Sequence, residues 1–296
     1  MQMEGKHLLQ RFFLYANPGK PETIPVVAAF ADLLSKHNCD ILLDTWLYEH
    51  LGIGRACKAD ELDRSVHAAV SFGGDGTLLR ILPRLAENDV PVLGVNMGHT
   101  GFLLELDPGD LHSMVNRLVV GDFYLQERLM LSCRIHGQGD FLVMNELALT
   151  RGHNPSSIVV EVTYQEERVY TIHGDGVLVS TPTGTTGYTL SAGGPVLHPD
   201  APCRVVVPVC SHIMTQRPMV LPVHGEIGLT VHGKCAVRHQ ISLDGQLVID
   251  PDTNSQVNIK SAERPARFIR FTPQRFLTRL HQKQLAWGNH IYGGTK

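Results

Sequence analysis

Long hydrophobic runs are absent from this chain of 296 residues, and no stretch approaches the length that crosses a membrane. The amino-terminal segment also lacks the charged, apolar and small-residue pattern of a signal peptide. No CxxC pair occurs, and the six cysteines stand alone in the sequence, which favours reduced thiols over a disulfide framework. These absences exclude membrane and secreted classes, and we expect a cytoplasmic protein.

An excess of charge of either sign is absent too. The chain carries 26 basic and 29 acidic residues, a formal net charge of -3, so it presents no general field for nucleic acid or acidic membrane. Hydrophobic residues make up 43% of the sequence, which is ordinary for a globular protein with a sizeable core. The length favours two domains.

The first part of the chain alternates short apolar runs with helical patterns, which predicts a parallel sheet covered by helices. The expected helices are Ile24–Ser35, Thr77–Asn88 and Leu111–Val120, the last closed by Gly121. The expected strands are Arg11–Tyr15, Asp40–Leu43, Ala68–Phe72 and Val90–Val95.

From about Phe123 the chain reads as a succession of short strands, which predicts an all-β domain. The run Phe141–Leu149 is one of these predicted strands. The tail Thr272–Leu285 has helical spacing. We therefore predict an α/β domain over residues 1–120, rejoined by the tail 273–296, and a β-rich domain over 121–272.

A glycine-rich turn, Gly73-Gly74-Asp75-Gly76-Thr77, follows one predicted strand and precedes a predicted helix. Such a turn lets a ligand approach the backbone closely, and the start of a helix suits phosphate. The simpler interpretation is a connecting turn with Thr77 as helix N-cap. Neither GxxxxGK[ST] nor GxGxxG occurs, so a phosphate here would be held by backbone and metal rather than by a Walker-type lysine.

Two further segments are rich in glycine and hydroxyl groups. Asn96–Leu103 (NMGHTGFL) follows the next predicted strand, so both turns are expected at one edge of the sheet. Asp175–Tyr188 contains Ser, Thr, Gly and Pro, and we interpret it as a long functional loop. Plain connecting loops remain the alternative for both.

Two polar pairs complete the candidates. Asn145-Glu146 lies within a predicted strand, so one of the two side chains faces inward and needs a partner. Asp244-Gly245 is interpreted as a hairpin turn.

In this order the motifs resemble those of the NAD kinases. GGDGT alone is shared with diacylglycerol and sphingosine kinases, but NMGHTGFL and Asn145-Glu146 are far more specific to NAD kinases. The Asp175–Tyr188 segment resembles a motif of the same family, and Asp244-Gly245-Gln246 and the ending Leu285–Gly288 match it as well. Four places depart from the family pattern: Thr185 replaces a serine, Gly174 and Gly187 each replace an alanine, and Asp200–Arg204 replaces an apolar stretch.

The resemblance implies transfer of the γ-phosphoryl group of ATP, or of another phosphoryl donor, to the 2′-hydroxyl of the adenosine ribose of NAD. It implies a Rossmann-like α/β domain and an all-β domain, with NAD between them. Asp75 would hold the reactive hydroxyl, and the donor phosphates would meet Gly73, Gly74, Gly76 and Thr77.

The resemblance also assigns the remaining candidates. Asn145 and Glu146 would contact the adenosine side, Thr183, Thr186 and Tyr188 would line the NAD pocket, and Asp175 would meet NAD through a hydroxyl or amide. Asn96 is expected to fix its loop. A divalent metal, Mg²⁺, is expected without assigned ligands.

The resemblance further implies a homodimer or homotetramer. Two other functions remain open: a lipid or sphingoid kinase that shares GGDGT, and a non-catalytic sensor of NAD or NADP.

Overall fold

The chain folds as two units of different architecture, which the computed structural model describes over residues 8–98, 101–153, 155–233, 238–251, 254–272 and 276–283. Unit 1 comprises Met1–Glu127 and Ala266–Lys296, and unit 2 comprises Arg128–Pro265. None of the helices in these ranges is both long enough and apolar enough to cross a membrane.

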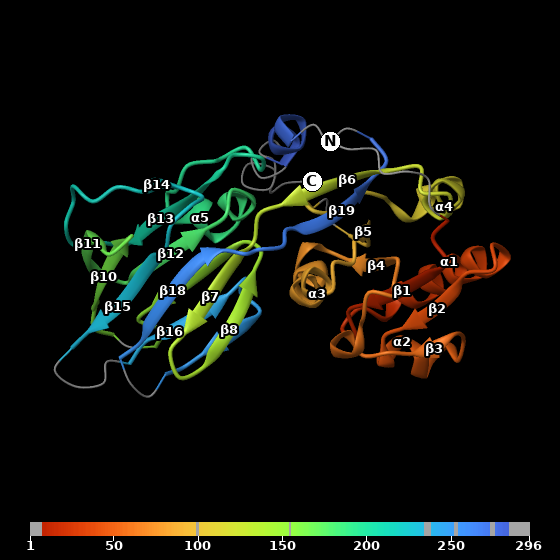
Figure 1. Ribbon diagram of the computed structural model, residues 1–296, viewed down its shortest axis with the longest axis horizontal. Helices are drawn as coiled ribbons and strands as arrows, with labels where there is room; N and C mark the ends of the chain where they lie inside the picture. The colour runs from red at the N-terminus through yellow and green to blue at the C-terminus, as the bar shows by residue number, and fades with distance from the viewer. Residues whose placement is uncertain are drawn as a thin grey trace, which may run out of the picture. The chain divides into compact units, whose positions relative to one another are not determined.

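Unit 1 is built on a seven-stranded sheet in the order β3-β2-β1-β4-β5-β19-β6 (Figure 1). Neighbouring strands from β3 to β19 are parallel. The strand β19 belongs to the last part of the chain and lies between β5 and β6, so the sheet is completed only after unit 2 has been traversed. The strands are β1 (Arg11–Ala16), β2 (Asp40–Leu43), β3 (Arg55–Ala56), β4 (Ala68–Gly73), β5 (Val92–Asn96), β6 (Tyr124–Arg128) and β19 (Ala266–Arg270).

The helices of unit 1 are amphipathic and bury their apolar sides. In α1, the buried residues Val27, Phe30, Ala31 and Leu34 recur at three- and four-residue steps, as expected for a helix with one face on a core. The helices are α1 (Ile24–Lys36), α2 (Thr45–Leu51), α3 (Asp75–Glu87) and α4 (Leu111–Val119), with short 3₁₀ turns η1 (Pro21–Thr23), η2 (Ala59–Glu61) and η3 (Pro108–Asp110). Residues 276–283 are also helical.

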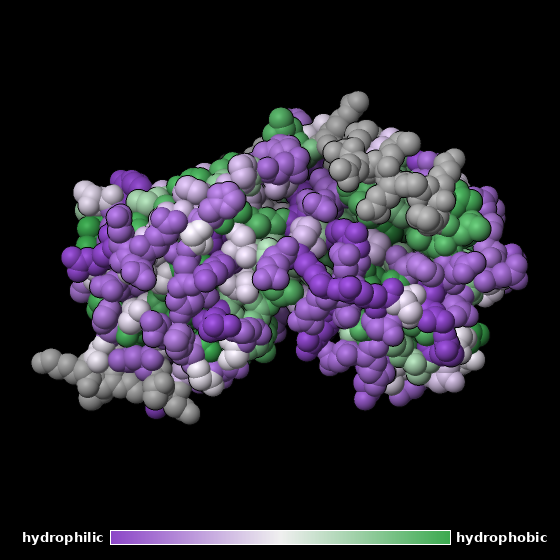
Figure 2. All heavy atoms as spheres, in the orientation of Figure 1, coloured by the Kyte–Doolittle hydropathy of each residue, from purple (hydrophilic) through white to green (hydrophobic). Residues whose placement is uncertain are grey.

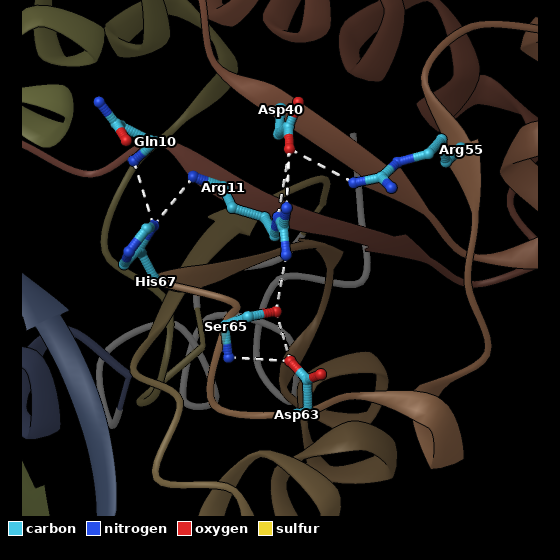
Figure 3. Close-up of polar contacts among 7 residues, drawn as sticks. All are labelled: Gln10, Arg11, Asp40, Arg55, Asp63, Ser65 and His67. Atoms are coloured by element: carbon cyan, nitrogen blue, oxygen red, sulfur yellow. Dashed lines mark hydrogen bonds and ion pairs between the residues drawn. The ribbon is translucent and has the colours of Figure 1, made fainter.

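Polar side chains join the strands at the amino-terminal edge of this sheet. Figure 3 shows the residues concerned: Gln10, Arg11, Asp40, Arg55, Asp63, Ser65 and His67. Arg11 Nη2 donates to Asp40 Oδ2 at 3.0 Å, and the backbone N–H of Arg11 donates to His67 Nδ1 at 3.0 Å. These contacts link β1 to β2 and β4, so this edge carries structural bonds and leaves the opposite edge for the glycine-rich turns.

Unit 2 is a pair of antiparallel sheets, in the orders β11-β10-β15-β18-β7-β8 and β14-β13-β12-β9-β16-β17. The first sheet contains β7 (Leu131–Ile135), β8 (Gly139–Val143), β10 (Ile158–Tyr164), β11 (Glu167–Gly174), β15 (Ile227–His232) and β18 (Gln256–Ser261). The second contains β9 (Glu146–Thr150), β12 (Gly176–Ser180), β13 (Cys203–Val209), β14 (Met219–Pro222), β16 (Gln240–Leu243) and β17 (Leu247–Ile249). A 3₁₀ turn η4 (Thr183–Thr186) and a short helix α5 (Tyr188–Ser191) follow β12.

A single apolar cluster fills the space between these two sheets. It takes Leu131 and Val160 from the first sheet and Leu149 and Val179 from the second. The face of unit 2 seen in Figure 2 is mainly hydrophilic. The mostly parallel α/β unit and the antiparallel unit confirm the predicted fold class.

Three local predictions were wrong. The run Phe141–Leu149 is two strands, β8 and β9, which belong to different sheets and are separated at Met144 and Asn145. The predicted loop Asp175–Tyr188 contains the strand β12, whose five residues are all buried and so show no alternation of polar and apolar residues. The expected helix start at Thr77, with Thr77 as N-cap in the simpler interpretation, is also wrong, because α3 begins at Asp75 and its N-cap is Gly74.

Arg204 ends the departing stretch Asp200–Arg204, and its side chain is completely buried in unit 2. Its guanidinium donates to the carbonyl oxygens of Pro222, His224, Gly225 and Ile259 at 3.0–3.3 Å. Burial lowers the pKa of this side chain. The arginine therefore ties β13 to the turn that precedes β15 and to β18.

We expect Arg204→Met to lower the free energy of unfolding by about 2–5 kcal/mol, because it leaves several buried carbonyl groups without a donor. Arg134→Met is the matched control: Arg134 pairs with Asp140 on the surface, so its loss should cost about 1 kcal/mol or less. Urea denaturation of both variants measures the difference. Equal losses would show that the buried bonds of Arg204 do not stabilise unit 2.

Candidate functional site

The turn between β4 and α3 places one carboxylate at the carboxyl-terminal edge of the parallel sheet. Gly73 ends β4, Gly74 is extended, and Asp75 is the first residue of α3. A Cβ on Gly73 would lie 2.3 Å from Thr77 Oγ1, so only glycine fits where the strand meets the helix. The first turn of a helix has backbone N–H groups without helical acceptors, which suits an anion.

Asp75 is held by the second predicted segment. The backbone N–H of Phe102 donates to Oδ2 at 2.8 Å, and that of Leu103 donates to Oδ1 at 3.1 Å. A Cβ on Gly101 would lie 1.9 Å from Asp75 Oδ1, so the close approach depends on this glycine. Each carboxylate oxygen still has a lone pair for a further hydrogen bond.

The carbonyl side of the same loop is held by the last described part of the chain. Arg279 Nη1 donates to Leu104 O at 2.6 Å and to Phe102 O at 3.5 Å. The neighbouring Glu105 is buried and accepts from the backbone N–H of Phe271 at 2.9 Å and from Arg270 at 3.3 Å. Sequence reasoning missed Glu105 and Arg279, because no local pattern links residues so far apart in the chain.

Asn96 lies at the start of this segment and makes two local bonds. Its Nδ2 donates to Asp107 Oδ1 at 2.9 Å, and its Oδ1 accepts from the N–H of Gly98 at 3.2 Å. These contacts are those of a residue that fixes its loop. His99 and Thr100 of the same motif lie outside the described residues, as does the ending Leu285–Gly288.

In unit 2, Asp244 stands on the turn of the β16–β17 hairpin, as predicted, with φ 51°. Its carboxylate accepts from the backbone N–H groups of Met144, Asn145 and Glu146, at 2.8, 2.6 and 3.2 Å. Three amide donors converge on one acid where β8 ends and β9 begins. This contact explains why the predicted strand is broken there.

Glu146 is the inward-facing member of its pair. Its side chain is 7% exposed, and Oε2 is buried without a hydrogen-bond partner. Burial, and then the charge of Asp244, raise the pKa of Glu146 to about 8. Burial also raises the pKa of Asp244, to about 6, against the effect of its three amide donors. Burial and mutual repulsion therefore favour a pair that shares one proton near neutral pH, and the larger rise favours the protonated form of Glu146.

The segment after β12 folds against this pair. Thr181 Oγ1 donates to Met144 O at 2.7 Å, and the Thr181 N–H donates to Asn145 O at 2.9 Å. A Cβ on Gly187 would lie 3.2 Å from Glu146 Oε2. Thr183 is buried and accepts from Arg128 at 3.4 Å, and the Thr186 hydroxyl donates to Thr183 O at 3.1 Å. Tyr188 is 44% exposed.

Asp175 lies away from these residues. In the ladder of β9 and β12, Ser180 pairs with Glu146 and Gly176 pairs with Thr150, so Asp175 lies beyond the opposite end of β12. The two ends are roughly 13 Å apart along the strand. Arg151 Nε donates to Asp175 Oδ1 at 2.8 Å. The structure thus brings Asn145, Glu146 and the threonines together and places Asp175 in a separate cluster with Arg151.

Comparison with known families and proteins gives matches over nearly the whole chain. The family model of the ATP-NAD kinase N-terminal domain matches residues 12–123, and that of the ATP-NAD kinase C-terminal domain matches residues 144–271. An NAD kinase of Geotalea daltonii is 30% identical over 95% of this chain and 99% of that protein. An NAD kinase of Wolinella succinogenes is 32% identical over 97% of this chain and 99% of that protein.

Solved structures show the same fold. Yeast NADH kinase in complex with NADH superposes with a TM-score of 0.86 at 21% identity, over 95% of this chain and 88% of the other. An NAD kinase from Archaeoglobus fulgidus in complex with ATP gives 0.73 at 26% identity, over 93% and 98%.

We expect Gly101→Ala to lower the free energy of unfolding by about 1–3 kcal/mol, because its Cβ displaces the Asp75 carboxylate from its two amide donors. Gly109→Ala is the control, since a Cβ there meets no atom within 4 Å. We expect a change of about 0.5 kcal/mol or less for the control. Urea denaturation measures both changes. Equal denaturation curves for the two variants would contradict the close contact between Gly101 and the Asp75 carboxylate.

The raised pKa of Glu146 predicts how stability depends on pH. Below about 4.5 the carboxyl is protonated in the folded and the unfolded chain; as pH rises toward about 8, only the unfolded chain loses the proton. The free energy of unfolding of the wild type, relative to that of Glu146→Gln, should therefore fall across this window and level off above it. Denaturation at pH 5, 7 and 9 measures the effect.

Glu226→Gln is the control for that series. A hydrogen bond from Lys260 lowers the pKa of Glu226, so its contribution is lost only under acid conditions and should not change between pH 5 and 9. A flat difference for Glu146→Gln would show that Glu146 is ionised in the folded protein.

Proposed function

The chain belongs to the NAD kinase family, and from this premise we propose how its residues carry out the reaction. The enzyme transfers the γ-phosphoryl group of ATP to the 2′-hydroxyl of the adenosine ribose of NAD, giving NADP. The observation that supports an assignment of roles is the single carboxylate Asp75, fixed by two amides at the start of α3.

Asp75 accepts a hydrogen bond from the ribose hydroxyl and orients it toward the γ-phosphorus. The 2′-oxygen then forms a bond to phosphorus while the bond to the bridging oxygen of ATP breaks, and ADP leaves with that electron pair. The hydroxyl proton passes to Asp75 as the new bond forms. A carboxylate is too weak a base to form an alkoxide beforehand, so the proton leaves late.

The glycine turn receives the donor. Gly73, Gly74, Gly76 and Thr77 form the turn that meets its phosphates at the amino terminus of α3, where the N–H of Thr77 already donates to Gly74 O at 3.0 Å. In unit 2, Asn145 and Glu146 contact the adenosine side, while Thr183, Thr186 and Tyr188 line the NAD pocket. Asp175 meets a part of NAD distant from the adenosine ribose, since it lies at the other end of β12.

Glu146 has a specific capacity in this arrangement. Because it keeps its proton near neutral pH, its carboxyl group can donate a hydrogen bond to a ligand oxygen or nitrogen, and its unpartnered Oε2 is the group available to do so.

A divalent cation, Mg²⁺, would be held mainly by the ATP phosphates and by water. In the described ranges, no three His, Cys, Asp or Glu side chains come together as ligands. Magnesium commonly takes only one or two carboxylates from the protein, so the residues present fit it. When bound, it would neutralise charge on the phosphates. The cytoplasmic location and the homodimer or homotetramer stay predictions.

The matches give no support to the lipid kinase or to the non-catalytic sensor. A coupled assay that detects NADP, with ATP and magnesium chloride, tests the proposed function, and its repetition with polyphosphate and with NADH defines the donor and the acceptor. Absence of NADP with every donor and metal would overturn the proposal.

We expect Asp75→Asn to lower kcat by about 10²–10⁴, the range for a positioned general base. The amide keeps one acceptor but turns its NH₂ toward a backbone N–H, either that of Phe102 or that of Leu103. NAD affinity should fall much less than kcat. NADP formation and calorimetric NAD binding are measured on the same preparation.

Asp60→Asn is the control for loss of an acid beside α3, because Asp60 pairs with Arg84 of that helix on the surface. We expect its turnover to be unchanged. Near-normal turnover of Asp75→Asn would refute the base role, and lost NAD binding with normal turnover at saturation would assign Asp75 to substrate binding alone.

A further inference from the structure

The helical residues 276–283 lie against Phe102 with one face. The rings of Phe276 and Phe102 have centroids 6.3 Å apart. Arg279 binds the carbonyl groups on both sides of Leu103, and Lys283 Nζ lies 4.1 Å from the centroid of the Phe102 ring. Steps of three and four residues keep these side chains on one side of a helix, so the position of Lys283 is set by the two contacts before it.

The ammonium group of Lys283 lies close to the site of reaction. The residue whose ring it covers is the one whose N–H holds Asp75 Oδ2. Burial lowers the pKa of Lys283, while the charge of Asp75 raises it and that of Arg279 lowers it. The ammonium group of Lys283 and the carboxylate of Asp75 therefore attract each other.

In the described part of the chain, Lys283 Nζ makes no hydrogen bond and no ion pair with an oxygen atom, although the side chain is half-buried. Burying an ammonium group without acceptors costs free energy, and oxygen atoms of a bound ligand would supply the missing acceptors.

We propose that Lys283 binds the phosphoryl group that is transferred, supplying the cation that the GGDGT turn does not contain. The inference rests on the proposed function, since it takes the hydroxyl at Asp75 as the acceptor. The γ-phosphorus must then lie next to Asp75. The ammonium group of Lys283 is therefore closer to the oxygens of the γ-phosphoryl group than to those of the α- and β-phosphates. Charge on these oxygens is stabilised by a fixed cation in the transition state.

A purely structural role is the competing explanation. Lys283 would then only pack against the ring of Phe102 and so position the Phe102 backbone N–H that donates to Asp75. Such a clamp would affect turnover, but it would not distinguish ATP from ADP, because the γ-phosphoryl group is the only difference between them. The two explanations therefore separate in binding rather than in turnover.

The test uses Lys283→Met, which keeps the length of the stem and removes the charge, and Lys283→Arg, which keeps the charge. We expect Lys283→Met to lower kcat about 10²-fold, to change the KM for NAD less than about threefold, and to weaken ATP binding about tenfold while ADP binding is unchanged. Lys283→Arg should recover ATP binding and part of the turnover. Lys36→Met is the control, because Lys36 pairs with Asp32 on the surface of α1.

Turnover and calorimetric binding are measured in one magnesium buffer, with melting temperatures for each variant. Unchanged ATP binding in Lys283→Met, or equal weakening of ATP and ADP binding, would overturn the proposal. Should the wild type form no NADP, the proposed function fails, while the comparison of ATP with ADP still decides whether Lys283 contacts a terminal phosphate.

Discussion

Two hydrogen bonds from one loop to one carboxylate set the geometry of unit 1. The amides of Phe102 and Leu103 face Asp75, and the carbonyl groups of Phe102 and Leu104 face Arg279. Phe102 and Leu103 lie in a bend, so their two N–H groups converge on one acid, and this short segment joins the glycine turn to the helix at 276–283. The position of Asp75 thus depends on a helix about 200 residues later in the sequence.

Unit 2 uses the same kind of contact for another purpose. The carboxylate of Asp244, on a hairpin turn, accepts hydrogen bonds from the backbone N–H groups of Met144, Asn145 and Glu146. Backbone N–H groups at the end of a strand need acceptors, and a buried carboxylate needs donors. The hydrogen bonds between them meet both needs. The arrangement ends β8, starts β9 in the other sheet and leaves Glu146 pointing inward beside a charged neighbour.

The sequence predicted the features that depend on neighbouring residues. The strand, glycine turn and helix around Asp75 follow one another within the chain, and the hairpin at Asp244 is marked by the Asp-Gly pair. The break within Phe141–Leu149 could not be predicted, because a polar pair within an apolar run does not itself end a strand, and the cause of the break is an acid about 100 residues away. The strand β12 was interpreted as loop because its residues are buried on both sides.

Likewise, the candidate list from sequence contained the acids and hydroxyls of the motifs but none of the cations beside Asp75. A net charge of -3 does not predict where individual charged side chains lie in the folded protein. Arg279 and Lys283 reach the glycine turn only because the chain returns to unit 1 through β19 and continues into the helix at 276–283.

Two carboxyl groups with nearly equal intrinsic acidity therefore acquire different chemistry from their surroundings. Asp75 has an amide on each oxygen and a lysine in its field, so negative charge is well accommodated there. Glu146 has a buried oxygen without a hydrogen-bond partner and an acid neighbour, so its surroundings raise its pKa and favour the protonated form. The first environment suits a group that accepts a proton from a hydroxyl, and the second suits a group that donates a hydrogen bond. Because each environment is built from backbone amides and one distant charge, neither role can be assigned from the residue type alone.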